Sequence, residues 1–207
     1  MRILIVDDHP MVRRGIRELL ESEHLITGVG EAETPDAALE EIRQRHWDVV
    51  LLDLHMPGRA GLDLLTTMRA DRPEMPILVV SAHSEDQYAI RVLRAGASGY
   101  VSKAAASEVL VHAVKRVAAG GRYISEKMAE QLAREAQDPV TPHQTLSDRE
   151  YQVLASIGEG KTVTEIAVAL GLSVKTVSTY RTRLMEKLGV RNTAELIRYA
   201  LDHGLVR

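Results

Sequence analysis

The chain has 207 residues, of which 45% are hydrophobic and 27% are charged, a composition that excludes a disordered or fibrous protein. It contains no cysteine, which excludes a disulfide-stapled domain and a thiolate zinc site and makes the cytoplasm the expected location. The opening apolar run is too short for a signal peptide or a membrane span, and it ends at Asp7 and Asp8, so no association with a membrane is expected.

The net charge of -3 is divided unevenly along the chain. From Leu146 onward there are 9 Lys or Arg residues and 7 Asp or Glu residues, so the part before it carries the acidic excess. Within 171–191 five residues are basic and one is acidic, a local stripe that a phosphate backbone would attract. A solvated helix face shows the same pattern, so charge alone leaves both interpretations open.

Apolar runs of strand length recur in the first part of the chain. The strong candidates are 3–6, 49–52 and 77–80, and the weaker ones are 25–29 and 99–102. Continuous runs rich in β-branched residues are typical of buried parallel strands. Helical patterns lie between them, so the sequence predicts five βα units in a doubly wound α/β fold, with helices on both faces of a parallel sheet in the order 2-1-3-4-5.

This α/β domain is expected to occupy residues 1–119. A linker is expected over 120–145, because that stretch begins with a Gly-Gly pair and ends in the polar segment QDPVTPHQT. A short helix is expected within the linker, at 125–135.

Residues 146–207 show a different pattern, with closely spaced short helices that have their own start and stop residues. Ser147 with Glu150, and Thr162 with Glu165, fit the capping box that begins a helix. The second domain is therefore predicted to be an all-α four-helix domain. The core residues expected in its last helix are Ile197, Ala200 and Leu201.

Polar residues stand at the carboxyl ends of four predicted strands, the edge at which open α/β sheets bind ligands. They are Asp7, Asp8, Asp53, Ser81 and Lys103. Three carboxylates in one place repel one another unless a hard cation lies between them, and oxygen ligands favour Mg²⁺ or Mn²⁺. Such a cation would gather phosphate oxygens, to which Lys103 supplies a charge and Ser81 a hydroxyl. Asp53 is then placed as a carboxylate nucleophile towards phosphorus.

Four segments of this domain, IVDDHPMVRRGI, VVLLDLHMPGRAGLDLL, ILVVSAHSE and RAGASGYVSK, resemble the signature blocks of the response-regulator receiver domain in order. The resemblance implies that Asp53 is the phosphoacceptor. It also implies that Asp8, Asp53 and the backbone carbonyl of His55 bind the metal, with Asp7 helping through water. The side chains of His9 and His55 are interpreted as loop residues and not as metal ligands.

The same resemblance implies roles for the residues at the last two strand ends. Ser81 and Tyr100 would form the switch pair, and Lys103 would contact the phosphoryl group, so that Ser81 and Lys103 are the catalytic residues. One departure is Ala104, because many receivers carry a proline after this lysine. The loop after the fifth strand is therefore expected to differ in shape.

The basic stretch falls within a turn and a helix expected over 174–187, with Ser173 as the N-cap. If Val177, Leu184 and Leu188 face the core, an outward stripe follows at helical spacing. Hydroxyl groups and a lysine on such a stripe suit base edges and phosphates, although an ordinary polar helix face is the alternative. The stripe consists of Lys175, Ser178, Thr179 and Thr182.

The segment LSDREYQVLASIGEGKTVTEIAVALGLSVKTVSTYRTRLMEKLGV resembles the LuxR-type helix-turn-helix, and its pairing with a receiver makes the chain similar to the NarL/FixJ class of response regulators. The resemblance implies a positioning helix at 164–170, a recognition helix at 174–187 and a helix at 193–203 that often pairs two such domains. Tyr180 and Thr164 depart from a common histidine and a common basic residue, so at least one usual phosphate contact is expected to be absent. The residues expected to contact DNA are Lys175, Thr176, Ser178, Thr179, Tyr180, Thr182, Arg183 and Lys187.

Together these features predict a transcription regulator that a sensor histidine kinase phosphorylates and that binds double-stranded promoter DNA as a homodimer, with RNA polymerase as a further partner. No separate enzymatic turnover is expected. One alternative is a Mg²⁺-dependent phosphohydrolase that uses Asp53, although His55 stands where many such enzymes carry a second acid. The other alternative is a regulator with an intact pocket that a partner protein or a ligand controls instead of phosphate.

Overall fold

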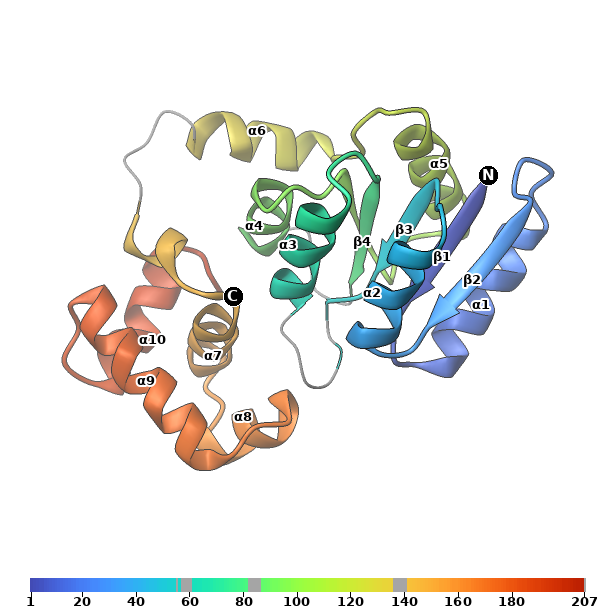
Figure 1. Ribbon diagram of the computed structural model, residues 1–207. Helices are drawn as coiled ribbons and strands as arrows, with labels where there is room; N and C mark the ends of the chain where they lie inside the picture. Colours follow the sequence, from blue (N-terminus) through green and yellow to red (C-terminus); the bar gives the residue numbers. More distant parts are fainter. Residues whose placement is uncertain (55, 57–60, 82–86, 136–140, 207) are drawn as a thin grey trace. The chain divides into compact units, whose positions relative to one another are not determined.

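The computed structural model of the chain describes residues 1–54, 56, 61–81, 87–135 and 141–206. The chain divides into two compact units, Met1–Ala133 and Arg134–Arg207. The first is built around a parallel sheet and the second from short helices (Figure 1). In the described part of the chain, no helix combines the length and the apolar character needed to cross a membrane.

The sheet of the first unit has five parallel strands in the order β2-β1-β3-β4-β5, as predicted. The strands are β1 Arg2–Val6, β2 Gly28–Ala32, β3 Val49–Leu52, β4 Ile77–Ser81 and β5 Gly99–Ser102. β3 and β4 are buried along their whole length, which is why they read as continuous apolar runs in the sequence. The strand order brings the carboxyl ends of β1 and β3 side by side at the centre of the sheet.

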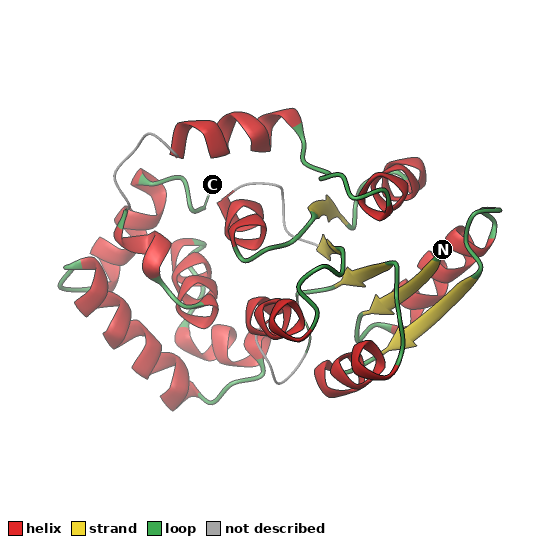
Figure 2. Ribbon diagram, turned by 45° about the horizontal axis from the view of Figure 1, so that its top comes forward, coloured by secondary structure: helices red, strands yellow, loops and turns green. Residues whose placement is uncertain are grey.

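In the described residues of the first unit, five helices cover both faces of this sheet (Figure 2). They are α1 Pro10–Glu21, α2 Pro35–Gln44, α3 Gly61–Asp71, α4 Gln87–Arg94 and α5 Ser107–Ala118. α1 and α5 share one core, in which Leu20 of α1 and Val114 of α5 pack with Ile5, Leu51 and Leu78 of the strands. The loops that leave the strands are therefore held at their ends by a packed two-sided scaffold.

The weakest predicted strand is displaced from its expected position. The prediction was 25–29, whereas β2 is Gly28–Ala32 and Leu25 is 61% exposed. The pairing register aligns Gly28 with the first residue of β1, so the strand begins only there. Gly30 suits this strand because the indole ring of Trp47 packs where a Cβ atom would stand.

The segment that follows α5 pairs with the outer edge of β5. The Tyr123 N–H donates to the Ser98 carbonyl (3.0 Å), and the Tyr100 N–H donates to the Tyr123 carbonyl (3.2 Å). A Cβ atom on Gly99 would lie 2.5 Å from that Tyr123 oxygen, so the approach requires glycine. The beginning of the predicted linker is thus bonded directly to the strand that carries Tyr100.

Gly99→Ala is expected to separate this segment from β5 and to destabilise the first unit by about 1–3 kcal/mol, as overpacking usually does. Hydrogen exchange at the Tyr123 and Tyr100 amides should speed up in the full chain. Gly28→Ala is the matched control, because the added Cβ would meet only Arg2 Cγ at an ordinary 3.9 Å. An unchanged hydrogen-exchange rate of the Tyr123 amide in Gly99→Ala would show that the pairing of this segment with β5 does not require glycine at position 99.

Among the described residues, six further elements follow α5, and three of them begin at capping residues that the sequence predicted. They are α6 Glu126–Glu135, η1 Pro142–Thr145, α7 Asp148–Gly158, α8 Val163–Leu170, α9 Val174–Leu188 and α10 Thr193–Asp202. Both predicted capping boxes form, at the starts of α7 and α8. Gly171 ends α8 in the left-handed conformation (φ +63°), and the Ser173 side chain caps α9. The tight succession of α8, turn and α9 is a helix-turn-helix.

One predicted core residue of the second unit was wrong. Leu201 is 50% exposed, whereas Leu196 and Ala200 are fully buried. These two buried positions are four residues apart and define the inner face of α10, and Leu201 lies about 100° around the helix from Ala200. The apolar residues of the sequence alone did not indicate which side of α10 faces the core.

Candidate functional site

The acidic residues at the strand ends meet in one pocket of the first unit. Asp7 and Asp53 follow β1 and β3 directly, and each is only 2% exposed. The Asp53 N–H donates to the Val6 carbonyl (2.8 Å), which ties the end of β3 to the end of β1. Asp8 keeps 24% of its side chain exposed and forms the open side of the pocket.

Lys103 lies between the two buried carboxylates. Its Nζ is 2.6 Å from Asp7 Oδ2 and 2.7 Å from Asp53 Oδ2. Its backbone N–H donates to the Ser81 carbonyl (2.7 Å), so the loop after β5 is anchored at the end of β4. Burial lowers the pKa of Lys103, but the hydrogen bonds and charges of Asp53 and Asp7 outweigh it and hold the pKa above its ordinary value. The lysine is therefore a fixed positive charge beside the candidate nucleophile.

The donor set of this pocket fits a hard divalent cation. Ligand atoms of Asp7, Asp8, His9 and Asp53 all lie within 4.8 Å of one another. Three of the four are carboxylates, the ligands that Mg²⁺ and Mn²⁺ prefer. The acidic cluster is thus compatible with Mg²⁺. The predicted backbone ligand His55 lies outside the described residues.

Two further residues contact the acidic cluster: His9, which the sequence analysis interpreted as a loop residue, and Arg13, which it did not single out. His9 Nδ1 lies 2.8 Å from Asp8 Oδ1 and 3.2 Å from Asp7 Oδ1, and the His9 N–H donates to Asp7 Oδ1 (2.8 Å). Arg13 is 8% exposed and donates from Nη1 to the Asp7 carbonyl (2.7 Å) and from Nε to Glu31 (3.1 Å). The sequence indicated that Arg13 lies on the buried side of its helix, because it stands three and seven residues before apolar positions that face the core. No sequence feature of His9 indicated its contact with the carboxylates, apart from its place next to Asp8.

The predicted switch residues stand on neighbouring strands. Ser81 is the last residue of β4 and Tyr100 the second of β5, and both are fully buried. Tyr100 pairs with Val79 in the ladder, and Ser102 pairs with Ser81. The Ala104 N–H donates to Ser102 Oγ (3.2 Å), a hydrogen bond that a proline at this position could not make.

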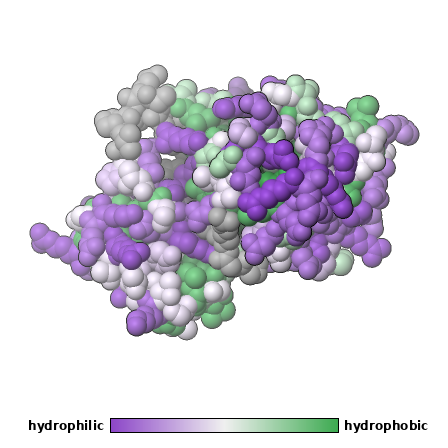
Figure 3. Space-filling model, in the orientation of Figure 1, coloured by the Kyte–Doolittle hydropathy of each residue, from purple (hydrophilic) through white to green (hydrophobic). Residues whose placement is uncertain are grey.

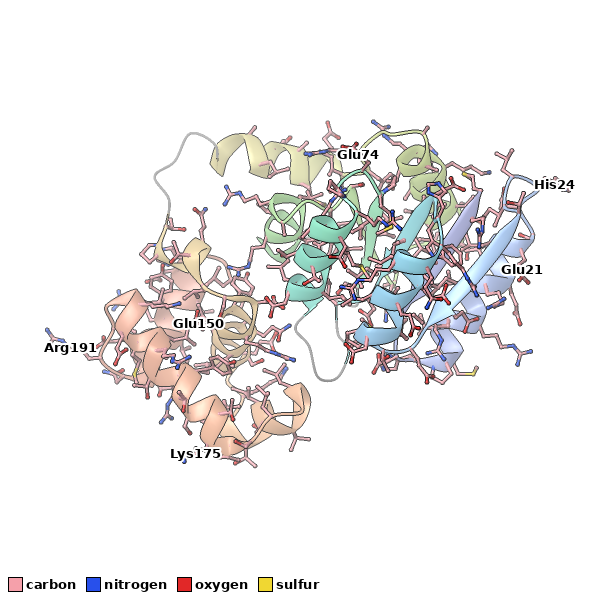
Figure 4. The ribbon with its side chains drawn as sticks, viewed as in Figure 1. Glu21, His24, Glu74, Glu150, Lys175 and Arg191 are labelled. Carbon is pink, nitrogen blue, oxygen red and sulfur yellow. The ribbon has the colours of Figure 1, made fainter. Side chains whose placement is uncertain are left out.

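The second unit exposes one polar face of α9. Val177, Leu184 and Leu188 are buried as predicted, and the opposite side carries the predicted stripe. Lys175 projects from the beginning of α9 (Figure 4). The visible surface of the molecule is largely hydrophilic, with small apolar areas (Figure 3). The exposed residues of the predicted DNA-contact set are Lys175, Thr179, Thr182, Arg183 and Lys187, and the half-buried ones are Thr176, Ser178 and Tyr180.

Two predicted DNA contacts bond to other side chains within the second unit. Lys187 Nζ lies 2.7 Å from Glu150 Oε2, and the same oxygen accepts the Ser147 N–H of the α7 capping box (2.8 Å). Burial raises the pKa of Glu150, but the bonds from Lys187 and Ser147 outweigh it and hold the pKa below its ordinary value. Thr176 Oγ1 is 2.8 Å from the Ser173 hydroxyl that caps α9. Both residues thus position helices as well.

Glu150→Gln is expected to destabilise the second unit by about 1–2 kcal/mol at pH 7, because the neutral amide lacks the negative charge that strengthens the hydrogen bonds from Lys187 and Ser147. Since the pKa of Glu150 is lowered, its contribution is complete above the ordinary value of 4.5 and is lost as the pH falls through the lowered pKa. The difference in free energy of unfolding between the variant and the unaltered protein should therefore become smaller as the pH falls. Urea unfolding followed by circular dichroism measures this difference, and the fluorescence of Trp47 identifies the transition of the first unit.

Glu159→Gln is the matched control, because Glu159 pairs with Lys161 on the surface, where both side chains are almost half exposed. Such a pair contributes little, so this variant should unfold at nearly the same urea concentration as the unaltered protein. If the loss of unfolding free energy caused by Glu150→Gln stayed constant down to pH 3, the ionised carboxylate could not be its cause.

Comparison with known proteins agrees with both halves of this description. Residues 3–115 match the family described as response regulator receiver domain, and residues 144–200 match the family described as bacterial regulatory proteins, luxR family. The chain is a response regulator of the NarL/FixJ class. Both predicted resemblances are thereby confirmed.

Full-length relatives share the two-part organisation of this response regulator. Response regulator UvrY of Escherichia coli (strain K12) is 39% identical over 208 residues, which cover 99% of this chain and 95% of UvrY. Response regulator GacA of Pseudomonas aeruginosa is 39% identical over 209 residues, which cover 100% and 98%. A solved structure of RcsB from Salmonella enterica serovar Typhimurium, bound to promoter rprA in the presence of phosphomimetic BeF3⁻, is 30% identical and superposes with a TM-score of 0.62, covering 96% of this chain and 97% of RcsB.

Proposed function

We propose that phosphorylation of Asp53 controls the binding of promoter DNA by α8 and α9, and that a sensor histidine kinase supplies the phosphoryl group in the cytoplasm. The chain is a phosphorylation-controlled, DNA-binding transcription regulator. The observation that carries the residue-level proposal is the placement of Lys103 between Asp7 and Asp53 at the carboxyl edge of the sheet. RcsB, a relative in fold and sequence, has been solved in complex with DNA.

In the proposed reaction Asp53 attacks the phosphorus of the donor. A bond forms between a carboxylate oxygen and phosphorus, and the bond from phosphorus to the leaving group of the donor breaks. Asp7 and Asp8, with Asp53 and the backbone carbonyl of His55, would hold Mg²⁺ or Mn²⁺. That cation would offset the charge of the phosphoryl oxygens.

Lys103 and Ser81 complete the proposed pocket. The ammonium of Lys103 now contacts Asp53, so it would need only a small movement to contact a phosphoryl oxygen on the same carboxylate. The Ser81 hydroxyl would donate to another oxygen. Tyr100 is proposed as the second switch residue, and the Tyr123 carbonyl that accepts its N–H would carry a change at β5 into the linker.

For the second unit we propose a homodimer on repeated half-sites. α9 would lie in the major groove, with half-site centres about 10 bp apart or a multiple of it. Residues 193–203 are the candidate pairing helix, and RNA polymerase is a further candidate partner. The proposed domain bounds are 1–119 for the receiver, 120–145 for the linker and 146–207 for the DNA-binding domain.

A DNase footprint on a promoter fragment tests this function. The full chain is compared with and without acetyl phosphate in the presence of Mg²⁺, and protection of two half-sites should appear at lower protein concentration after phosphorylation. An unchanged footprint despite stoichiometric phosphorylation would favour control by a partner or a ligand. Continuous release of inorganic phosphate in large molar excess over protein, with no footprint, would favour the phosphohydrolase instead.

A further inference from the structure

The hydroxyl groups of two outward threonines on α9 are already engaged by the helix itself. Thr179 Oγ1 donates to the Lys175 carbonyl (3.0 Å), and Thr182 Oγ1 donates to the Ser178 carbonyl (3.2 Å). Both side chains are exposed. A hydroxyl has one hydrogen, so each of these threonines offers solvent a methyl group and an acceptor lone pair, but no free donor.

An exposed valine lies on the same side of the helix. Val174 is 48% exposed, although it begins a helix whose other valine, Val177, is fully buried. Residues 174, 178 and 182 follow at intervals of four, as do 175 and 179 beside them, so these positions form one surface. The face proposed to enter the groove therefore carries apolar methyl groups between its charged positions.

The major groove distinguishes bases by donors, acceptors and one methyl group. Guanine presents two acceptors, which require donors from the protein. Thymine presents a methyl group that apolar side chains contact, and the adenine paired with it presents an amino donor. Hydroxyl lone pairs can accept from the amino group of either adenine or cytosine, whereas the methyl groups match thymine alone and no free donor is left for guanine.

We infer that α9 reads A·T base pairs, through contacts of the Thr179 and Thr182 methyl groups with thymine methyl groups in the major groove. This inference rests on the proposed DNA-binding function and names the base pairs that the same face selects. Lys175 and Arg183 then contact phosphates and contribute affinity without sequence preference. The competing reading is that each threonine leaves its backbone carbonyl on binding and donates its hydroxyl to a base.

Paired substitutions separate the methyl group from the hydroxyl. Thr182→Val keeps the methyl group and removes the hydroxyl, and Thr182→Ser does the reverse. Affinity of the phosphorylated full chain is measured by gel shift on a site selected from random DNA. Thr182→Val should bind within about twofold of the unaltered protein, whereas Thr182→Ser should lose about fourfold, the effect of burying one methyl group. The same pair is made at Thr179.

Changes in the DNA provide a second test of the methyl contact. Replacing one thymine of the site by uracil removes only the methyl group, and at a contacted position it should weaken the unaltered protein about fourfold. The same replacement should have no further effect on the serine variant that lacks the partner methyl group. Thr66→Ser is the matched control, because Thr66 on α3 makes the same kind of bond, to the Leu62 carbonyl (2.9 Å), far from α9 in the sequence.

The inference is overturned if Thr179→Val and Thr182→Val lose affinity while the serine variants keep it and uracil is tolerated, because the hydroxyl would then be the reading group. It is also overturned if all four variants and every uracil replacement leave binding unchanged. In both of these cases the unaltered protein still selects a DNA site, so the proposed function stands and only the inference fails. If the unaltered protein selects no DNA sequence at all, the proposed function fails as well.

Discussion

Asp53→Asn is expected to reduce labelling by a phosphodonor to background and to make DNA affinity independent of that donor. Asparagine has nearly the size of aspartate, so the buried position at the end of β3 stays filled. Its amide lacks the anionic oxygen that attacks phosphorus, and one of the three carboxylate charges that would hold a divalent cation is lost with it. Incorporation of phosphate from labelled donor in the presence of Mg²⁺, followed by gel shift, measures both effects.

Asp63→Asn serves as the control, because Asp63 is an exposed acid in the first turn of α3 and lies outside the pocket. This variant should be labelled to the same extent as the unaltered protein. Labelling of Asp53→Asn on another aspartate, identified by mass spectrometry after borohydride reduction, would show that the phosphoacceptor has been assigned to the wrong residue.

Lys103→Met is expected to have the largest effect on stability, a loss of about 3–5 kcal/mol from the free energy of unfolding of the first unit in the absence of divalent cations. The side chains of Asp7 and Asp53 are 3% and 1% exposed, and the ammonium between them is their shared counter-charge. Without it two buried carboxylates face each other. Urea unfolding followed by Trp47 fluorescence reports on this unit, because Trp47 is the single tryptophan and is buried there.

Mg²⁺ should restore much of this loss, since a cation bound to the folded pocket stabilises it by mass action. The increase in the free energy of unfolding on adding Mg²⁺ is therefore expected to be larger for Lys103→Met than for the unaltered protein. Lys115→Met is the control, because the Lys115 to Glu23 pair (2.7 Å) is 40% and 30% exposed and contributes at most about 1 kcal/mol. Equal losses in the two variants, or no gain from Mg²⁺, would mean that Lys103 is not the counter-charge of the pocket.

The buried strands and three helix starts could be predicted from local patterns, and the sheet order followed from the doubly wound fold that the βα alternation predicts. Val49–Leu52 and Ile77–Ser81 are buried on both faces and so appear as unbroken apolar runs. Capping depends on residues three apart, and the boxes at Ser147 and Thr162 therefore formed as predicted. β2 was displaced because it is an edge strand in which Gly30 packs against Trp47, a contact that the local sequence pattern does not show.

By itself, the sequence determined which chemical groups stand at the strand ends and which residues begin α9, because both follow from alternation and capping over a few neighbouring residues. Only the tertiary structure decided how these groups are paired. Lys103 meets two carboxylates from strands far apart in the chain, and Lys187 meets Glu150 across two helices. Arg13 became part of the pocket through a backbone carbonyl, which every residue carries. Helical spacing indicated only that Arg13 lies on the buried side of α1, whereas the partner of each of these side chains depends on where packed elements bring them in space.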